Sequence, residues 1–355
     1  MPRSTINGTA IDLDGKEMIL DADQDTTITA DTDDQIDIKI AGSDKLVISS
    51  TSHLSTTTAG TSNFVLGVNA GNSIQSGGNY NVALGDEAGT AITTGDRNIA
   101  IGFEAGKAIS TGGENVAIGY QALATEDGNG LNIAIGSEAL ENLNAGADAY
   151  NVAVGHNAGK NVTTGTQNTL IGGLSGDAIT DADGNVAVGY ASLTTNVLGS
   201  DSVAIGKNAL NLQNPASATA MKNVAVGKNA GESITTGTEN TIVGTSALDA
   251  ATTGIRNVAI GTNALTSDTA GEASTAVGYG ALYTQNFTSS TASYNTALGY
   301  HAGVNLTTGV RNTLIGSDVA DALTTGNQNT IVGEGAGSAL TDADYNVVLG
   351  RAALP

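Results

Sequence analysis

The chain has 355 residues, of which 48 are glycine, three are proline and none is cysteine or tryptophan. Thirteen basic against 35 acidic residues give a formal net charge of −22, which argues against a nucleic-acid partner and against contact with an anionic bilayer. No apolar run reaches 18 residues, so we expect no membrane insertion. Since nine Tyr and three Phe cannot fill a conventional core of this size, the composition favours a repeat protein.

Residues 1–62 are expected to form a small N-terminal β module that attaches or caps the rest of the chain. In Ile36–Ile40, Ile alternates with charged residues, which is typical of a strand with one apolar face. Further strands are expected at 18–20, 26–29 and 46–48, followed by a Ser/Thr-rich neck at 49–62. The first residues lack the apolar core of a secretory signal, so we expect synthesis in a cytoplasm.

The best candidate for a metal site is the acidic run Asp21, Asp23 and Asp25, which imitates the first half of a calcium-binding loop. The pattern then departs, because Thr26 stands where such loops have Gly and Thr32 stands where they have Glu. A solvated acidic turn is the alternative. We expect no cofactor elsewhere, since the three His residues share no position in the repeat described next.

A pentad of the form Asn-Val-Ala-Ile-Gly occurs 17 times between residues 63 and 350. It begins with Asn in 15 copies and ends with Gly in all 17. Most copies are 17 residues apart, and every fourth interval is longer, with extended connections at 142–150, 211–222 and 283–294. One pentad per coil, at about 4.8 Å per coil, predicts a rod of roughly 80 Å.

Each pentad is expected to be a short β-strand that ends at a corner. The fourth position is always aliphatic, as at Ile205 and Ile260, which we expect to lie in the core of every coil. The closing glycines, such as Gly119, Gly206 and Gly261, suit a corner that requires positive φ. The Asn column, represented by Asn115, is expected to be structural, with hydrogen bonds from one coil to the next. The fold class is therefore all-β, a parallel β-solenoid over 63–355, with about two short strands and two turns per coil.

Two positions downstream of the pentad compensate for each other. Where the ninth residue of a coil is Gly, the twelfth is aliphatic, as in Gly106 and Ile109. Where the ninth is Leu, the twelfth is polar or small in all coils but one, as in Leu265 and Asp268. We interpret this as one aliphatic side chain filling one slot per coil from either of two places.

The pentads are apolar on both faces, because positions two and four point one way and position three points the other. Strands of this kind are buried on both faces, and one thin coil covers only one of them. We expect identical chains to cover the other face in a closed homotrimer, the simplest closed arrangement for such a rod.

Aromatic side chains near the longer connections are the candidate binding residues. Tyr150 and Tyr294 close two of these connections, and Tyr283 and Phe287 lie within 283–294. Exposed rings suit contact with a host-surface glycan or protein. The alternative is that these rings fill the wider coil.

The pentads at 115–119 and 202–206 resemble the head repeats of trimeric autotransporter adhesins, although the coil here is longer. That resemblance implies left-handed parallel β-rolls packed as trimers. The longer strings 115–123 and 20–28 look more like tail-fibre and appendage proteins of marine bacteriophages. They imply a virion fibre that is made in the host cytoplasm, released by lysis and joined to other subunits through its N-terminal module.

Two other functions stay open. A self-assembling extracellular filament or bacterial surface adhesin would use the last coil to accept the N-terminal module of the next subunit. A glycan-degrading spike would need two carboxylates placed in a cleft, and the sequence offers no such pair. We therefore expect a structural and adhesive protein rather than an enzyme.

Overall fold

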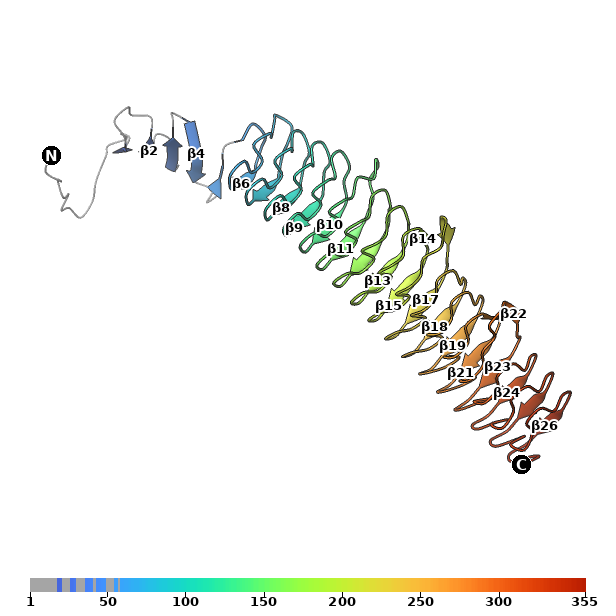
Figure 1. Ribbon diagram of the computed structural model, residues 1–355. Helices are drawn as coiled ribbons and strands as arrows, with labels where there is room; N and C mark the ends of the chain where they lie inside the picture. The colour runs from blue at the N-terminus through green and yellow to red at the C-terminus, as the bar shows by residue number, and fades with distance from the viewer. Residues whose placement is uncertain (1–17, 21–25, 30–35, 41–42, 49–53, 57) are drawn as a thin grey trace, which may run out of the picture.

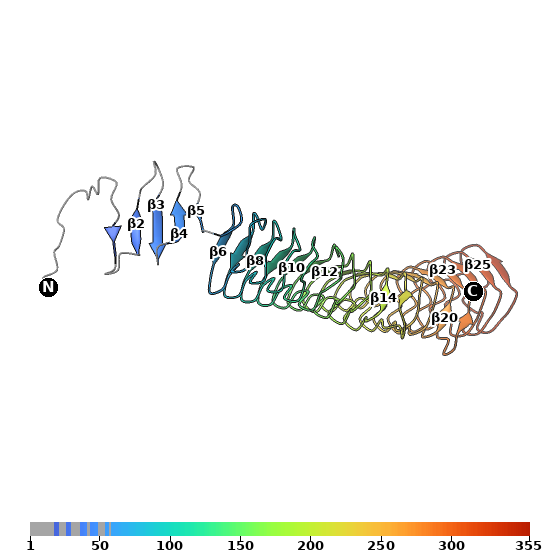
Figure 2. The ribbon, with the colours of Figure 1, turned by 90° about the horizontal axis from the view of Figure 1, so that it is seen from above.

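A computed structural model describes residues 18–20, 26–29, 36–40, 43–48, 54–56 and 58–355. The described residues are all-β and form two parts, a small sheet and a long solenoid (Figures 1 and 2). In the first part, each strand pairs antiparallel with the next in the order β1-β2-β3-β4-β5. These strands are β1 (Met18–Ile19), β2 (Thr27–Thr29), β3 (Ile36–Ile40), β4 (Ser43–Ile48) and β5 (Leu54–Ser55). The expected N-terminal strands are thereby confirmed, and β5 lies in the stretch predicted as a neck.

The predicted parallel solenoid is confirmed. Seventeen three-residue strands, one in each pentad, form a ladder in which each strand pairs in parallel and in register with the next, as Val203 pairs with Val224. They are β6 (Phe64–Leu66), β7 (Val82–Leu84), β8 (Ile99–Ile101), β9 (Val116–Ile118), β10 (Ile133–Ile135), β11 (Val152–Val154), β12 (Thr169–Ile171), β13 (Val186–Val188), β15 (Val203–Ile205), β17 (Val224–Val226), β18 (Thr241–Val243), β19 (Val258–Ile260), β21 (Thr275–Val277), β23 (Thr296–Leu298), β24 (Thr313–Ile315), β25 (Thr330–Val332) and β26 (Val347–Leu349).

The expectation of two strands per coil is wrong. Each coil, which we call a rung, carries one ladder strand, and the rest of the rung consists of turns. These turns still stack through main-chain hydrogen bonds, such as Thr93 N–H to the Ser110 carbonyl at 2.8 Å. Extra strands in the solenoid occur only where two longer connections pair with the preceding rung: β14 (Gly199–Ser200) with β16 (Thr219–Ala220), and β20 (Gly271–Glu272) with β22 (Thr291–Ala292).

The core of the solenoid combines small side chains, mostly Ala, with larger aliphatic side chains such as Ile109. The third pentad residue points inward and is fully buried, as at Ala100 and Ala204. The shared slot is confirmed at Gly106, where a Cβ atom would lie 2.8 Å from Cδ1 of Ile109. Leucines at the ninth position, such as Leu265, are fully buried in the equivalent place.

The placement of Ile205 and Ile260 in the core of the coil is wrong for the single chain. Their side chains are 39% and 37% exposed, because they lie on the outer face of the strand. The alternation was predicted correctly, but in these rungs the inward face belongs to Ala204 and Ala259, which are fully buried. In several other rungs the inward residue is a larger aliphatic one, such as Leu170.

The glycine corners and the asparagine column are confirmed. Gly206 has a φ of 136°, and a Cβ atom there would lie 2.4 Å from the carbonyl oxygen of Gly227 in the next rung. Within the column, Asn98 donates its main-chain N–H to Oδ1 of Asn81 at 2.8 Å and its Nδ2–H to the Gly112 carbonyl at 2.8 Å. The side chains therefore bond mainly to the main chain of neighbouring turns. Asn115 continues the pattern, with its N–H bonded to Asn98 Oδ1.

The stretch after β5 is bonded to the first rung. Thr56 accepts a hydrogen bond through Oγ1 from the Val65 N–H at 2.9 Å, and Thr58 Oγ1 accepts one from Asn63 Nδ2 at 2.9 Å. These threonines therefore satisfy polar groups at the exposed start of the ladder.

Candidate interaction surfaces

The most extensive candidate site is the outer side of the strand ladder, which we call the strand face. It consists of the second and fourth pentad residues of all 17 rungs, which are Val, Ile, Leu, Thr or Phe without a single charge. Its exposed aliphatic members are Leu66, Ile133, Ile135, Ile171, Ile205, Val224, Val243, Ile260, Leu298, Val347 and Leu349, and Thr241 and Thr330 are exposed as well. At about 4.8 Å per rung and 10 Å across three residues, the strip covers on the order of 800 Å². Soluble monomers rarely expose an apolar strip of that size.

Two columns border the strand face. The entry edge is the column formed by the residue directly before each pentad, and the exit edge is the column formed by the residue directly after each pentad. Eight of the nine tyrosines and one phenylalanine occupy these edges: Tyr80, Tyr150, Tyr294 and Tyr345 on the entry edge, and Phe103, Tyr120, Tyr190, Tyr279 and Tyr300 on the exit edge. All nine rings are exposed. The sequence showed their phase in the repeat, but this grouping emerges only once the strand is known to face outward.

Rings on neighbouring rungs stack along the exit edge. Phe103 and Tyr120 have centroids 5.7 Å apart, and Tyr279 and Tyr300 are 5.6 Å apart with nearly parallel planes. His301 packs on Tyr300 at 3.9 Å, and its Nδ1 lies 3.6 Å from Oδ1 of Asp318. The rung spacing thus aligns equivalent side chains into ladders along the rod.

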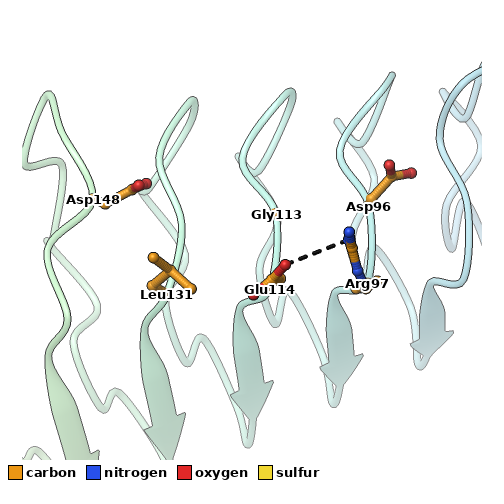
Figure 3. A pocket seen from close by; sticks show the side chains of 6 residues that line it. All are labelled: Asp96, Arg97, Gly113, Glu114, Leu131 and Asp148. Carbon is orange, nitrogen blue, oxygen red and sulfur yellow. Dashed lines mark ion pairs between the residues drawn. The ribbon is translucent and has the colours of Figure 1, made fainter.

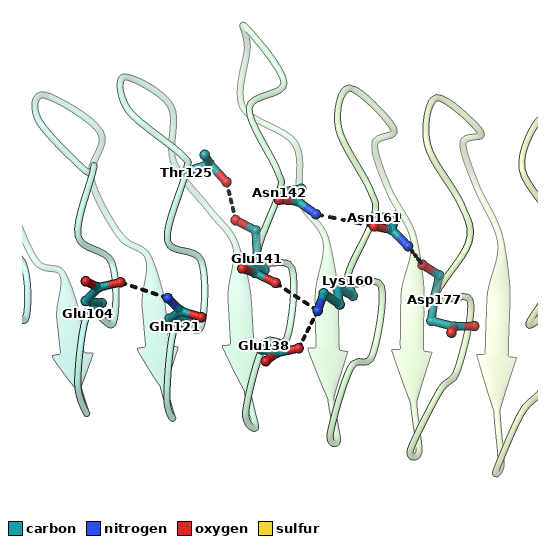
Figure 4. Close-up of polar contacts among 9 residues, drawn as sticks. All are labelled: Glu104, Gln121, Thr125, Glu138, Glu141, Asn142, Lys160, Asn161 and Asp177. Atoms are coloured by element: carbon teal, nitrogen blue, oxygen red, sulfur yellow. Dashed lines mark hydrogen bonds and ion pairs between the residues drawn. The ribbon is translucent and has the colours of Figure 1, made fainter.

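Charged side chains pair between rungs in the same way. On the entry edge, Arg97 lies 3.4 Å from Glu114 across one rung step (Figure 3). Farther round the coil, Lys160 lies between Glu138 and Glu141 (Figure 4). The hydrogen bond that Lys160 donates to Glu138 raises the pKa of the ammonium group. Arg97 and Glu114 are largely solvated, so their pair contributes little to stability, whereas the side chains of Lys160, Glu138 and Glu141 are only 23–33% exposed.

A shallow hollow of about 250 Å³ lies on the entry edge, lined by Asp96, Arg97, Gly113, Glu114, Leu131 and Asp148 (Figure 3). Two of its carboxylates are engaged by main-chain donors. Asp96 accepts the Asn79 N–H at 2.6 Å, and Asp148 accepts the Gly130 N–H at 3.1 Å. The hollow therefore reflects turn stabilisation and offers no arrangement of a general acid facing a general base.

The four aromatic candidates from the sequence do not form one site. Tyr150 and Tyr294 lie on the entry edge, and Tyr283 is exposed within its connection. Phe287 is only 7% exposed and is therefore a buried ring. The connections themselves project from one side of the rod; in Figure 1, the loop that pairs with β14 and the loop that contains β22 show this.

The candidate cation ligands Asp21, Asp23 and Asp25 lie outside the described residues. Among the residues that the structure describes, no group of three His, Asp or Glu side chains is placed to hold a metal ion. The same part of the chain contains no helix long and apolar enough to cross a membrane.

A polar network that the sequence analysis missed supports two of the three longer connections, 211–222 and 283–294. Two pentads begin with Ser instead of Asn, at Ser202 and Ser274, and each is followed eleven residues later by a buried glutamine. Gln213 Oε1 accepts hydrogen bonds from Ser202 Oγ and from Nδ2 of Asn223. In the sequence, this network could have been recognised because the pentad begins with Ser instead of Asn in the same two rungs in which the twelfth residue is Gln.

Comparison with known proteins gives no further identification: no protein-family model matches this chain, and neither a curated protein nor a solved structure is significantly similar to it.

Proposed function

We propose that this chain is the subunit of a structural and adhesive virion fibre, a phage tail fibre or appendage, built from three parallel copies that meet through their strand faces. The observation that carries this proposal is the uncharged apolar strip along all 17 rungs. The fibre has a mechanical and attachment role and catalyses no reaction.

A second copy of this chain is the occupant that best fits the strand face. Chains with a net charge of −22 repel one another, yet the strand face itself has no charge to desolvate. An identical rod also matches the strip rung for rung over its full length. Three copies close around one axis and leave no strand face exposed.

The assignment to a virion rests on the resemblance of residues 115–123 and 20–28 to phage appendage proteins. In such a fibre, the N-terminal module joins other virion subunits, and the projecting connections at 142–150, 211–222 and 283–294 lie on the outside. They are the surfaces through which we expect the fibre to bind a glycan or protein of the host surface.

Substitution on the strand face tests the assembly. Ile205→Asp or Ile260→Asp places a charge on the solvated face of a single chain but inside the trimer, where an unpaired carboxylate is costly. We expect light scattering to give about three times 35.1 kDa for the wild type and a monomer for both variants. Thr236→Asp, on an exposed turn away from the strand face, is the matched control and keeps the wild-type mass. A monomeric wild type contradicts the proposal.

Immunogold labelling locates the protein in its biological assembly. Antibodies against this chain are applied to particles purified from a lysed culture of its source and viewed by negative stain. Label on rods that project from virus particles supports the proposal. Label on cell surfaces or on open-ended polymers without particles contradicts it and supports the adhesin or filament instead.

A further inference from the structure

We infer that Asn129 is a site of covalent self-modification. In this reaction, the main-chain nitrogen of Gly130 attacks Cγ of Asn129, the side-chain nitrogen leaves as ammonia, and a five-membered succinimide ring joins the two residues. Water then opens the ring to aspartate or isoaspartate. The reaction happens once per chain and does not depend on the proposed function.

The fold does not require the side chain of Asn129. Asn129 is the fifteenth residue of its rung, a position that is Gly in most other rungs, as at Gly271. The fold uses the main-chain carbonyl there, which accepts a hydrogen bond from Nδ2 of Asn115 at 2.9 Å. The next residue has to be Gly, because a Cβ atom on Gly130 would lie 2.2 Å from the carbonyl oxygen of Gly113. Only the glycine of this Asn-Gly pair is therefore a packing requirement.

A buried carboxyl group contacts the amide that leaves. Glu126 is fully buried, and its Oε1 accepts hydrogen bonds from the main-chain N–H and from Nδ2 of Asn129, both at 3.1 Å. Its Oε2 is also buried and has no hydrogen-bond partner among the described residues. Burial raises the pKa of Glu126, although the hydrogen bonds from Asn129 oppose this shift. In its acid form, Glu126 can give a proton to the departing nitrogen.

A second carboxylate contacts the nitrogen that attacks. Asp148, which borders the hollow in Figure 3, accepts the Gly130 N–H through Oδ1 at 3.1 Å. The hydrogen bond from Asn115 to the carbonyl of the same peptide group polarises that group and makes the N–H easier to deprotonate. Asp148 takes this proton and Glu126 gives one, while one C–N bond forms at Cγ and another breaks. The ring closure is thus balanced without an oxidant or reductant.

The turn that holds Asn129 lies beside a longer connection that leaves the regular stack. Asn115 bonds to the fifteenth residue of its own rung, but Asn132 in the next rung donates its Nδ2 back to the Gly130 carbonyl at 3.0 Å. The fifteenth residue of that next rung, Gly146, is exposed, and a Cβ atom there would meet nothing within 4 Å. Asn129 itself is only half-buried, so water can reach the ring and open it.

Timed mass spectrometry of the full-length protein at neutral pH tests the reaction. Fragment spectra assign the site, because residues 7–8 are also Asn-Gly. We expect Asn129 in the folded chain to react at least about tenfold faster than in a synthetic peptide of residues 122–136. Asn129→Gly, which introduces the residue of most other rungs, is the control and should form no product here while melting as the wild type does. A folded chain that reacts no faster than the peptide overturns the proposal.

Glu126→Gln and Asp148→Asn test the two carboxyl groups. The same slot holds Gln at Gln213 and Gln285, so we expect the Gln variant to fold and to keep an acceptor for Asn129. Each variant should slow the reaction by about tenfold or more in the folded chain. Unchanged rates in both variants overturn the assigned roles.

The pH profile of the wild type needs no substitution. In the peptide, the reaction accelerates as the pH rises, because the attacking N–H has to lose its proton. The folded chain needs the acid form of Glu126 together with the carboxylate of Asp148, so its rate should pass through a maximum at mildly acidic pH. A rate that rises steadily with pH, as in the peptide, overturns the participation of Glu126.

Ring closure also removes a tie of the connection 142–150, since the ring nitrogen of Gly130 has no hydrogen to donate to Asp148. Isoaspartate then lengthens the main chain by one atom. We expect faster hydrogen exchange of the amides in 142–150 in aged than in fresh wild type, and no change in aged Asn129→Gly. Unchanged exchange in wild type that has fully reacted overturns this consequence.

Discussion

Two consecutive four-rung blocks, residues 151–222 and 223–294, have the same length and the same rung spacings but hold their longer connections differently. In the later block, buried Asp268 accepts the N–H groups of Gly271 and Phe287 through Oδ1, both at 3.0 Å. The equivalent residue in the earlier block is Asn196, whose Oδ1 accepts the Gly199 N–H at 2.9 Å. The residue equivalent to Phe287 is Pro215, which has no N–H to satisfy.

The two glutamines show the consequence. In the later block, Gln285 donates through Nε2 to Asp268 Oδ2 at 2.6 Å and to Ser274 Oγ at 2.9 Å. In the earlier block, Nε2 of Gln213 is buried without a hydrogen-bond partner. The later connection is thus fully bonded but buries a carboxylate, whereas the earlier one avoids the charge and leaves an amide donor unsatisfied. The solenoid accommodates either solution, because each rung contacts mainly its neighbours.

The largest effect is expected when the two glutamines are removed. Gln285→Ala leaves the buried Asp268 carboxylate without its side-chain donor, which we expect to destabilise the rung by about 3–5 kcal/mol. Gln213→Ala also opens a cavity but removes an amide that is already half unsatisfied, so we expect about 1–3 kcal/mol. Local hydrogen exchange of the amides in 283–294 and in 211–222 measures each loss where it occurs. Equal losses in the two blocks would contradict this account of the network.

Much of this architecture could be predicted from the sequence, because the recurring pentad reveals both the length of each coil and the position of its β-strand. The 17-residue spacing fixes the in-register ladder, and the closing glycine of each pentad marks the corner, as Gly206 does with its φ of 136°. The coupled changes at Gly106 and Ile109 predicted a contact that the structure confirms.

Which face of each strand points into the core could not be predicted in the same way. Both faces of a pentad are apolar, so the alternation alone does not tell whether Ala204 or Ile205 points inward. In this rung the smaller residue points inward, but Leu170 and Ile242 occupy the same inward position in other rungs and are fully buried, so side-chain volume alone does not decide it. The entry and exit edges were missed for the same reason, because their place beside a surface follows only from this choice.

The same pair of substitutions in the shared slot should have different effects on stability in two rungs with similar sequences. In Gly106→Leu with Ile109→Ser, the new leucine replaces the lost isoleucine among small neighbours, and we expect the double variant to recover most of the stability that each single change loses. The same exchange at Gly231 and Ile234, at the start of the later block, should fail. There a Cβ atom would already lie 2.8 Å from Cδ1 of Ile242.

We expect the double variant Gly231→Leu with Ile234→Ser to lose about 1–3 kcal/mol of folding free energy from overpacking. Melting temperatures of the four single and two double variants measure the coupling. Additive losses at 106 and 109 would show that the two side chains do not share one slot, and recovery at 231 and 234 would show that Ile242 does not limit the space.

Substitutions of the two aromatic residues in the 283–294 connection test separately for a role in packing and a role in recognition. Phe287→Ala removes a buried ring, so we expect a loss of about 3 kcal/mol in that connection, measured by local hydrogen exchange. Tyr283→Ala changes an exposed ring and should keep the wild-type exchange and melting. If the connection binds the host surface, Tyr283→Ala reduces binding of labelled fibre to host cells, and Asn211→Ala, its equivalent in the earlier block, is the matched control. Unchanged binding by Tyr283→Ala excludes this ring as a receptor contact.

The smallest expected effect is a pH dependence of the longer connection in the later block, which holds a buried carboxylate where the earlier one has Asn196. Burial raises the pKa of Asp268 above its ordinary value, although main-chain and side-chain hydrogen bonds oppose this shift. Because the pKa is higher in the folded than in the unfolded chain, the folded state binds the proton first, and stability at this site rises as the pH falls from neutral toward the ordinary Asp pKa. Asp268→Asn removes the titrating group, so its stability relative to the wild type should fall on acidification. Asn196→Asp places a carboxyl next to the unpartnered Gln213 amide in the earlier block. The stability of this variant relative to the wild type should rise on acidification, opposite to that of Asp268→Asn. Hydrogen exchange of each connection at pH 7 and near pH 5 measures both trends, and parallel pH profiles of the wild type and Asp268→Asn would show that this carboxylate does not couple to folding.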